Sequence, residues 1–265
     1  KIEIVNSTDK EKRQKYVKYL YKKLQRDGQL ERDVDRLVRN DRIAWGSSMI
    51  ACNDADAMVT GNIRHYAASI EKLKKVVDSR PGEELFGMTM MVSKGKTILV
   101  ADTNVKDFPS AERLANVSQS CVRVARLFGF EPKVAFLSHS TFGKPVSKNT
   151  KHVRDAIELL KTKNVDFDFD GEMQPDVALN PIYQEIYPFS KIVGKANILM
   201  MPALHSAAIS TKLMKTFGGA KLIGPLLIGL GLPIEVAPLR SSTSEILNLA
   251  SIAAYSSDII DYSKN

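Results

Sequence analysis

The segment 196–233 constrains the fold most, because its pattern predicts a strand, a helix and a second strand in close succession. Residues 198–201 form a short apolar run that ends at Pro202, which is typical of a buried parallel strand. A loop of small residues, 205–207, is expected to lead into the helix. The apolar side of that helix is predicted to consist of Ala208, Ile209, Leu213, Met214 and Phe217.

A glycine pair and a second apolar run complete this segment. The glycines at 218–219 end the helix, since glycine adopts the left-handed conformation common at helix C-termini. Residues 222–223 begin the second strand, which continues through 224–230. Two strands joined by a crossover helix predict one parallel βαβ unit, and ligands in α/β folds bind beside the ends of such strands.

The rest of the chain also alternates mostly between strand and helix. Strands are predicted at 57–59, 134–137, 167–169 and 234–237. Long helices are predicted at 9–27, 62–78, 110–128 and 244–261. Residues 85–92 and 97–101, separated by SKGK, predict a β-hairpin. This order predicts an α/β fold with mostly parallel sheets.

Composition and charge exclude several classes of protein. The chain is 44% hydrophobic and 26% charged, which is ordinary for a globular protein, and no apolar run approaches the ~18 residues of a membrane span. The net charge of +8 comes mostly from polar helix faces without an aromatic stacking platform, so neither nucleic acid nor a membrane is expected as partner. Cys52 and Cys121 lie in apolar helical contexts, which favours a reduced, cytoplasmic setting.

One loop has the composition of an anion site. The sequence SHSTFGK, residues 138–144, directly follows a predicted strand. Its hydroxyls, its backbone N–H groups near Gly143 and the Lys144 ammonium are together able to hold a phosphate. The spacing is not that of a Walker A loop, and from the residues alone a polar turn that satisfies its own backbone is slightly favoured. The candidate ligand-binding residues are Ser138, His139, Ser140, Thr141, Gly143 and Lys144.

Other polar groups give weaker signals. Asp170 and Glu172 flank Gly171 at a strand end, and two interpretations stay open: a carboxylate pair for a metal or proton transfer, or a glycine-centred turn with solvated acids. The four histidines are scattered without metal-ligand spacing. The pattern Gly229-x-Gly231 is too short for a dinucleotide fingerprint.

Several segments together resemble the phosphotransacetylase (phosphate acetyl/butyryltransferase) family. They are NDADAMVTG at 53–61, LSHSTFGK at 137–144, DGEMQPDVAL at 170–179, and GPLLIGLGLP at 224–233. They occur in the family's order and span nearly all 265 residues. MPALHSAAISTK and the terminal NLASIAAY are closer still to the C-terminal phosphotransacetylase-like domain of bacterial NADP-dependent malic enzymes.

This resemblance implies a specific architecture. It is two α/β lobes with mostly parallel sheets around a cleft, similar to isocitrate dehydrogenase. The first lobe is discontinuous, with residues 1–82 and 224–265, and the second lobe, residues 83–223, is inserted into it. The family's domain begins roughly one or two βα units before Lys1, so the N-terminal part of the first lobe is expected to be missing.

The resemblance also implies a CoA-binding site and the loss of the family's catalytic residues. It makes the 138–144 loop phosphate-binding and adds Gly224, Pro225 and Gly229, so CoA is expected in the cleft between the two segments. Active members carry a Ser-Arg pair and an aspartate, which align here with Pro238-Leu239 and Glu245. Losing one oriented donor costs about 10²–10³ in rate. The resemblance therefore implies no catalytic residue in working order.

The function implied is a non-catalytic regulatory and oligomerisation domain of an NADP-dependent malic enzyme, with acetyl-CoA as its regulatory ligand. Its partners would be a covalently linked malic-enzyme domain, which would use NADP and a divalent metal (Mg or Mn), and at least one further copy of the chain. The broad apolar surface of the last helix favours contact with such a copy. Two alternatives stay open: an active phosphate acetyltransferase, making acetyl phosphate and CoA from acetyl-CoA and phosphate, and an oligomerisation module without ligand.

Overall fold

The computed structural model describes residues 2–102 and 105–259, and their contacts divide into two compact units. One unit is formed by residues up to Pro81 together with those from Leu230, and the other by Gly82–Gly229. The boundary expected between 223 and 224 falls inside a strand, Lys221–Ile228, which pairs with Phe86–Ser93 of the second unit. The whole strand therefore stays with the second unit.

The first unit is mostly helical around one short pair of strands. Strand β1 runs parallel to β8, with Met58 opposite Ile234 and Gly61 opposite Ala237. Helix α1 is capped by the Asp9 side chain, which accepts hydrogen bonds from the N–H groups of Glu11 and Lys12. Its elements are α1 (Lys10–Leu24), the 3₁₀ turn Gln25–Asp27, α2 (Glu31–Asn40), α3 (Arg42–Ala51), β1 (Met58–Gly61), α4 (Tyr66–Val76), β8 (Ile234–Ala237) and α10 (Thr243–Ile259).

The last helix was predicted to reach residue 261, but residues 260–261 lie outside the described residues.

The second unit consists of β2 (Phe86–Ser93), β3 (Lys96–Ala101), α5 (Ala111–Leu127), β4 (Lys133–Leu137), the 3₁₀ turn Lys148–Thr150, α6 (Lys151–Thr162), β5 (Asp168–Met173), α7 (Pro175–Leu179), α8 (Pro181–Gln184), β6 (Ile198–Met200), α9 (Leu204–Thr216) and β7 (Lys221–Ile228).

Among the described residues, the second unit's strands form one mixed sheet of order β5-β4-β6-β3-β2-β7. The pairs β4–β5, β4–β6 and β3–β6 are parallel, whereas the predicted hairpin β2–β3 and the pair β2–β7 are antiparallel. Strands β6 and β7 point the same way, but the hairpin lies between them. The expected βαβ unit therefore corresponds to a crossover that skips two strands, because the hairpin fills the centre of the sheet.

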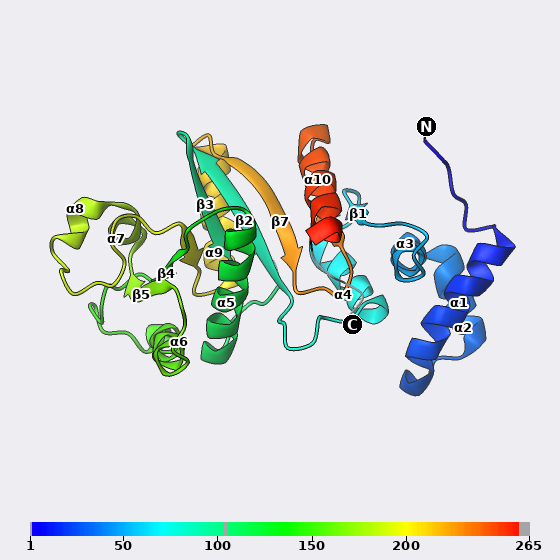
Figure 1. Ribbon diagram of the computed structural model, residues 1–265, viewed down its shortest axis with the longest axis horizontal. Helices are drawn as coiled ribbons and strands as arrows, with labels where there is room; N and C mark the ends of the chain where they lie inside the picture. Colours follow the sequence, from blue (N-terminus) through cyan, green and yellow to red (C-terminus); the bar gives the residue numbers. More distant parts are fainter. Residues whose placement is uncertain (1, 103–104, 260–265) are drawn as a thin grey trace. The chain divides into compact units, whose positions relative to one another are not determined.

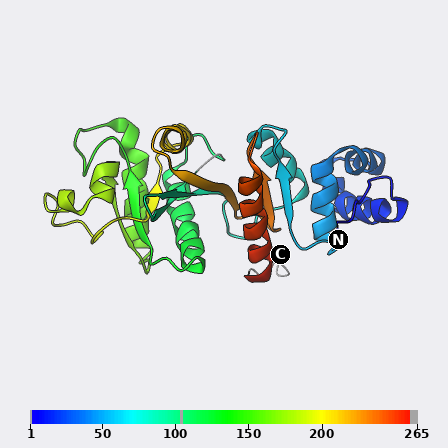
Figure 2. The same cartoon turned by 90° about the horizontal axis from the view of Figure 1, so that it is seen from above.

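Helices cover both faces of this sheet. Figures 1 and 2 show α5 and α9 on opposite faces. Because side chains alternate along a strand, Val100, Ala135 and Leu199 belong to the core on the α7 and α9 face, and their neighbours point to α5 and α6. No helix among the described residues is long and apolar enough to cross a membrane.

Helix α9 corrects two expectations from sequence. It begins at Leu204, so residues 205–207 are helical and do not form a loop. Its predicted apolar side is turned outward, since Ile209 is 64% exposed and Phe217, just past the helix end, is 91% exposed. Small residues, such as Ala207, make its buried contacts instead. The spacing was right for a helix, but spacing alone does not tell which side faces the core.

The close packing of β7 against the start of β2 gives a stability prediction. Gly229 has φ +89°, and an added methyl would overlap the Glu84 carbonyl oxygen and lie 2.8 Å from its carbon. Gly95 in the hairpin turn has a similar φ of +72° with open space around it. Gly229→Ala is expected to lower the free energy of unfolding by about 2–4 kcal/mol and Gly95→Ala by about 1–2 kcal/mol, since only the former adds overpacking to backbone strain.

Urea denaturation of both variants beside the parent chain measures this difference. Equal losses would mean that the Glu84 carbonyl moves away without cost.

Candidate functional site

The candidate anion loop, residues 138–144, begins where β4 ends. Strand β5 runs parallel to β4, with Phe136 opposite Gly171 and Leu137 opposite Met173. The last residues of β5 therefore lie directly beside the start of the loop. This places Glu172, whose side chain is 1% exposed, under the loop.

Four donors surround the Glu172 carboxylate or its backbone. The Ser140 hydroxyl donates to Oε1 at 2.9 Å and the Gly143 N–H donates to the same oxygen at 3.0 Å. Arg154 of α6 approaches Oε1 at 3.2 Å. The Phe142 N–H donates to the Glu172 carbonyl oxygen at 2.8 Å. A buried carboxylate is costly unless paired and hydrogen-bonded, so these contacts fix the inward shape of the loop.

The remaining polar atoms of the loop are also used internally. The backbones of Thr141 and Lys144 exchange two hydrogen bonds, at 2.8 and 3.1 Å. The Thr141 hydroxyl accepts from the Gln174 N–H at 3.1 Å, and the Gln174 amide donates to the His139 carbonyl at 2.6 Å. The Ser138 and Ser140 hydroxyls are 3.2 Å apart. Seven residues of chain are thus held as a closed turn.

This geometry corrects the donor set expected for a phosphate. The hydroxyls of Ser138, Ser140 and Thr141 are buried and occupied, and the Gly143 N–H points to Glu172 rather than outward. His139 and Lys144 are the loop's exposed candidates. Within the described residues the Lys144 ammonium makes no ion pair. The loop therefore offers a ligand the positive charge of Lys144, held on a rigid turn.

The two carboxylates that flank Gly171 do not converge. Asp170 accepts from the N–H groups of Gly171 and Lys191, at 2.9 and 2.8 Å, and Glu172 is enclosed by the loop. Neither is a solvated acid of a simple turn, and they do not form a pair that faces one ligand. In the part of the chain that the structure describes, no three metal-binding side chains cluster.

Gly224, Pro225 and Gly229 do not join the loop. They lie in or just after β7, and β4 and β7 are four strand positions apart in the sheet, about 19 Å at the usual strand spacing. Carbon added at Gly224 would lie 2.9 Å from the Met88 carbonyl oxygen. Backbone atoms of neighbouring segments, and not a ligand, therefore occupy the space beside Gly224 and Gly229.

The degenerate positions lie at the start of α10 in the first unit. Ser242 and Glu245 form a capping box: the Ser242 N–H donates to Glu245 Oε2 at 2.8 Å, and the Glu245 N–H donates to the Ser242 hydroxyl at 3.3 Å. Pro238 and Leu239 precede this cap, and neither side chain has a hydrogen-bonding group. Glu245 therefore has a structural role at the helix start.

Sequence reasoning missed two charged groups, the half-buried Arg154 and the buried Asp102. Arg154 was not singled out, although an arginine on the first turns of the helix after an anion loop is the available signal. Asp102, after β3, accepts from the Gly87 N–H at 3.0 Å and from Arg113 at 2.8 Å. Burial raises the pKa of Asp102 even though the Arg113 guanidinium opposes the shift.

Comparisons with known proteins place this geometry among relatives. The family model described as phosphate acetyl/butaryl transferase matches residues 1–254. The NADP-dependent malic enzyme of Rhizobium meliloti is 44% identical over 254 residues, which cover 96% of this chain and 33% of that protein. The phosphate acetyltransferase of Bacillus subtilis is 28% identical over 86% of this chain and 72% of that protein.

A solved structure has the same fold. The EutD phosphotransacetylase from Staphylococcus aureus superposes with a TM-score of 0.84 and 25% identity, over 97% of this chain and 79% of that one. The α/β fold expected from sequence is thereby confirmed. The chain spans about one third of the length of the malic enzymes it matches.

The Glu172 contacts give the prediction for this site. Glu172→Gln keeps the shape of the side chain but removes the negative charge to which Ser140, Gly143 and Arg154 donate hydrogen bonds. Hydrogen bonds to charged groups contribute about 1.5–3 kcal/mol, so the free energy of unfolding should fall by about that amount, and amide exchange at Gly143 should accelerate.

Glu158→Gln is the matched control, because Glu158 pairs with Lys161 at 2.7 Å on the exposed side of α6. An exposed pair contributes less than about 1 kcal/mol. Equal losses in the two variants would contradict an anchoring role for Glu172.

Proposed function

The chain belongs to the phosphate acetyl/butaryl transferase family, and on that premise we propose that it is a regulatory domain that binds acetyl-CoA without transferring the acetyl group. The observation that carries this proposal is the start of α10. At the positions aligned with the Ser-Arg pair and the aspartate of active members, Pro238 and Leu239 lack donors and the Glu245 carboxylate holds the capping box.

Acyl transfer needs groups that stabilise charge as it develops on the reacting atoms. A hydroxyl and a guanidinium would do so at a tetrahedral intermediate, and a free carboxylate would take the thiol proton of CoA. Pro238 and Leu239 provide neither donor. Glu245 accepts hydrogen bonds from Ser242, so its carboxylate is oriented toward the helix start. Binding without turnover is the chemistry left to such a chain.

Lys144 is the group that we assign to the ligand. Its ammonium is exposed on a turn whose backbone is fixed by Thr141 and Glu172. CoA carries several phosphate charges, and a charge-assisted hydrogen bond from a preorganised lysine stabilises one of them. His139, also exposed on the loop, is placed to add a second contact.

We further propose that a malic-enzyme domain is covalently joined to this one and responds to acetyl-CoA. The likeness to NADP-dependent malic enzymes along 96% of the chain supports this arrangement. In it, NADP and a divalent metal, Mg or Mn, belong to the malate-decarboxylating domain, and the location is cytoplasmic. Whether the ligand inhibits or activates that domain is set by which state of the assembly it binds more tightly.

Exposed apolar side chains support assembly of at least a dimer. Leu247 and Tyr255 are exposed on α10, and Ile209 and Leu213 on α9. Apolar side chains grouped on a helix surface are typical of contact with another copy. The alternative of an active phosphate acetyltransferase is favoured only by the likeness to the Bacillus subtilis and Staphylococcus aureus enzymes.

The first prediction from this proposal concerns turnover. No acetyl phosphate should form from acetyl-CoA and phosphate, because the aligned positions offer no donor to the developing charge. A coupled assay for released CoA measures it, with a phosphate acetyltransferase as positive control. Turnover within about tenfold of the usual enzyme median, near 10 s⁻¹, would favour the transferase alternative instead.

The second prediction concerns the ligand. Lys144→Ala should weaken acetyl-CoA binding by about tenfold or more in isothermal titration calorimetry, the loss expected for one charge-assisted hydrogen bond. Lys163→Ala serves as control, because Lys163 follows α6 and donates to Asn116 at 3.0 Å, away from the loop. Equal affinity of the two variants would remove Lys144 from the site, and no heat in any of the proteins would favour a module without ligand.

A further inference from the structure

Arg154 of α6 connects two parts of the chain that lie on either side of Lys144 in the sequence. Its Nη1 atom donates to Glu172 Oε1, below the loop, at 3.2 Å and to the Thr150 hydroxyl at 2.7 Å. Its Nη2 atom donates to the Ser147 carbonyl oxygen at 3.3 Å. The guanidinium therefore bridges the buried anchor of the loop and the turn that follows Lys144.

Helix α6 is a fixed base for this bridge. Four of its apolar side chains are buried against the sheet's side of the helix: Val153, Ala156, Ile157 and Leu160. Nε2 of His152 lies 2.9 Å from the Pro202 carbonyl oxygen, in the segment after β6. If the bridge is lost, the turn 147–150 is therefore freed more readily than the helix.

Thr150 gives up a usual helix contact to take part in the bridge. It is the N-cap of α6, where a threonine hydroxyl normally accepts a hydrogen bond from an N–H of the first turn. Within the described chain the Thr150 hydroxyl makes no such bond. It accepts from Arg154 and donates to the Ser147 carbonyl oxygen at 3.1 Å instead. A local rule broken in this way is expected where a position serves a site.

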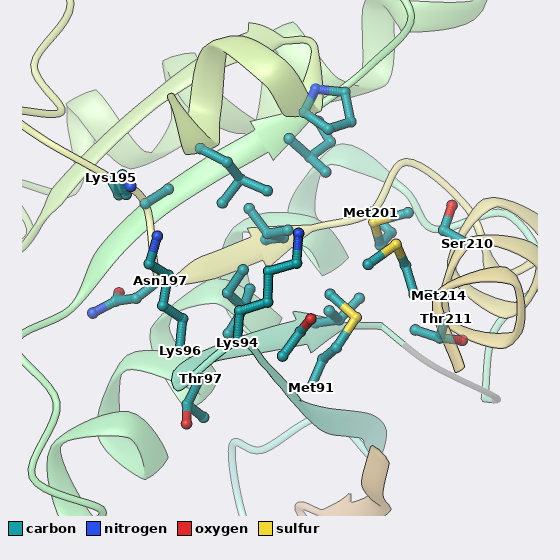
Figure 3. A pocket seen from close by; sticks show the side chains of 18 of the residues that line it. Met91, Lys94, Lys96, Thr97, Lys195, Asn197, Met201, Ser210, Thr211 and Met214 are labelled. Carbon is teal, nitrogen blue, oxygen red and sulfur yellow. The ribbon is translucent and has the colours of Figure 1, made fainter. Parts of the chain in front are cut away.

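Other exposed lysines of the second unit have a simpler support. Lys94 and Lys96 reach from the turn between β2 and β3, beside α9 (Figure 3). This side of the sheet carries the exposed α9 side chains that are assigned above to a second copy. Lys144 is instead held before it by Thr141, through two backbone hydrogen bonds, and after it by the turn 147–150. Two anchors therefore orient Lys144, whereas a single turn carries the other two lysines.

We propose that Arg154 is a positioning residue for Lys144. By closing the segment 144–150, the guanidinium keeps the Lys144 ammonium oriented toward an anionic ligand, so that less freedom is lost on binding. Arginine suits this task because its planar fork reaches separate acceptors at once, whereas lysine offers one ammonium on a flexible stem. The inference rests on the proposed acetyl-CoA function for the identity of the ligand, but not for the closure of the loop.

Amide exchange in the full chain tests the closure without any ligand. Arg154→Lys keeps a positive charge beside Glu172, but one ammonium does not hold all three acceptors. Exchange over residues 144–151 should therefore accelerate by at least about tenfold. Thr150→Val removes the hydroxyl and leaves Arg154 and Glu172 in place, and it should act in the same direction. Unchanged exchange in both variants would overturn the proposal.

Arg126→Lys and Thr162→Val are the matched controls. Arg126 of α5 holds a carboxylate oxygen and the carbonyl oxygen of Asp166, both at 3.0 Å, with the same two nitrogens that Arg154 uses. Thr162 donates to the Leu159 carbonyl oxygen at 2.7 Å, with the same sequence spacing as the threonine of the bridge. Asp166 precedes β5 and Thr162 ends α6, so both lie away from the strand ends that carry the loop. Neither control should change exchange over 144–151.

Calorimetry with acetyl-CoA tests whether the closure acts through Lys144. Arg154→Lys should weaken binding by about three- to tenfold, approaching the loss expected for Lys144→Ala. The two substitutions combined should bind within about twofold of Lys144→Ala alone, since a positioning residue has no effect once the group that it positions is gone. A merely structural role lowers stability without this non-additivity. Additive losses would overturn the proposal.

The two measurements separate this proposal from the proposed function. If the parent chain gives no heat with acetyl-CoA, the proposed function fails, and amide exchange alone decides the role of Arg154. If the parent chain binds and Arg154→Lys and Thr150→Val bind equally well, the proposed function stands and the positioning role is wrong. Thermal unfolding of each variant verifies its fold.

Discussion

The buried charge of Glu172 is the interaction on which the candidate site depends. A carboxylate removed from water needs several donors, and here they come from the loop after β4 and from α6. Satisfying it closes residues 138–144 into a turn whose hydroxyls face inward. The same requirement leaves Lys144 on the outside. One desolvated group thus decides both the rigidity of the loop and the kind of ligand contact that it is able to make.

Sequence patterns predicted the elements of this fold better than their roles. Segments 85–92 and 97–101, separated by SKGK, predicted the hairpin, and the apolar runs predicted the strands at 134–137 and 234–237. The order of strands was not predictable from local patterns, since it is set by pairing between distant residues. Helix α9 shows the limit most clearly: its spacing predicted a helix, but which side faces the core depends on the sheet against which it packs.

The same limit applies to the site. The composition of 138–144 allowed a phosphate loop but slightly favoured a polar turn that satisfies its own backbone, and the family resemblance favoured the phosphate loop. The identity of a donor does not say to which acceptor it points. Glu172 lies 32 positions from Ser140 in the sequence, and its carboxylate accepts the hydrogen bond of the Ser140 hydroxyl. Likewise, Gly224 and Gly229 permit close approach, as glycines do, but the approaching group is the backbone of the neighbouring segment. Competition between internal and external partners is a property of the folded chain and not of the motif.

The pairing of β1 with β8 has a consequence for how this protein is made. Met58 lies opposite Ile234, so β1 lacks its pairing partner until residues 234–237 have left the ribosome. The inserted unit, 82–229, emerges complete before that. During synthesis, helices α1–α4 and strand β1 are therefore made first but lack β8, while the sheet of the inserted unit is able to fold. Nascent chains in which residue 229 but not residue 234 has left the ribosome should be cleaved by proteases within the part of the first unit up to Pro81, while the inserted unit resists them.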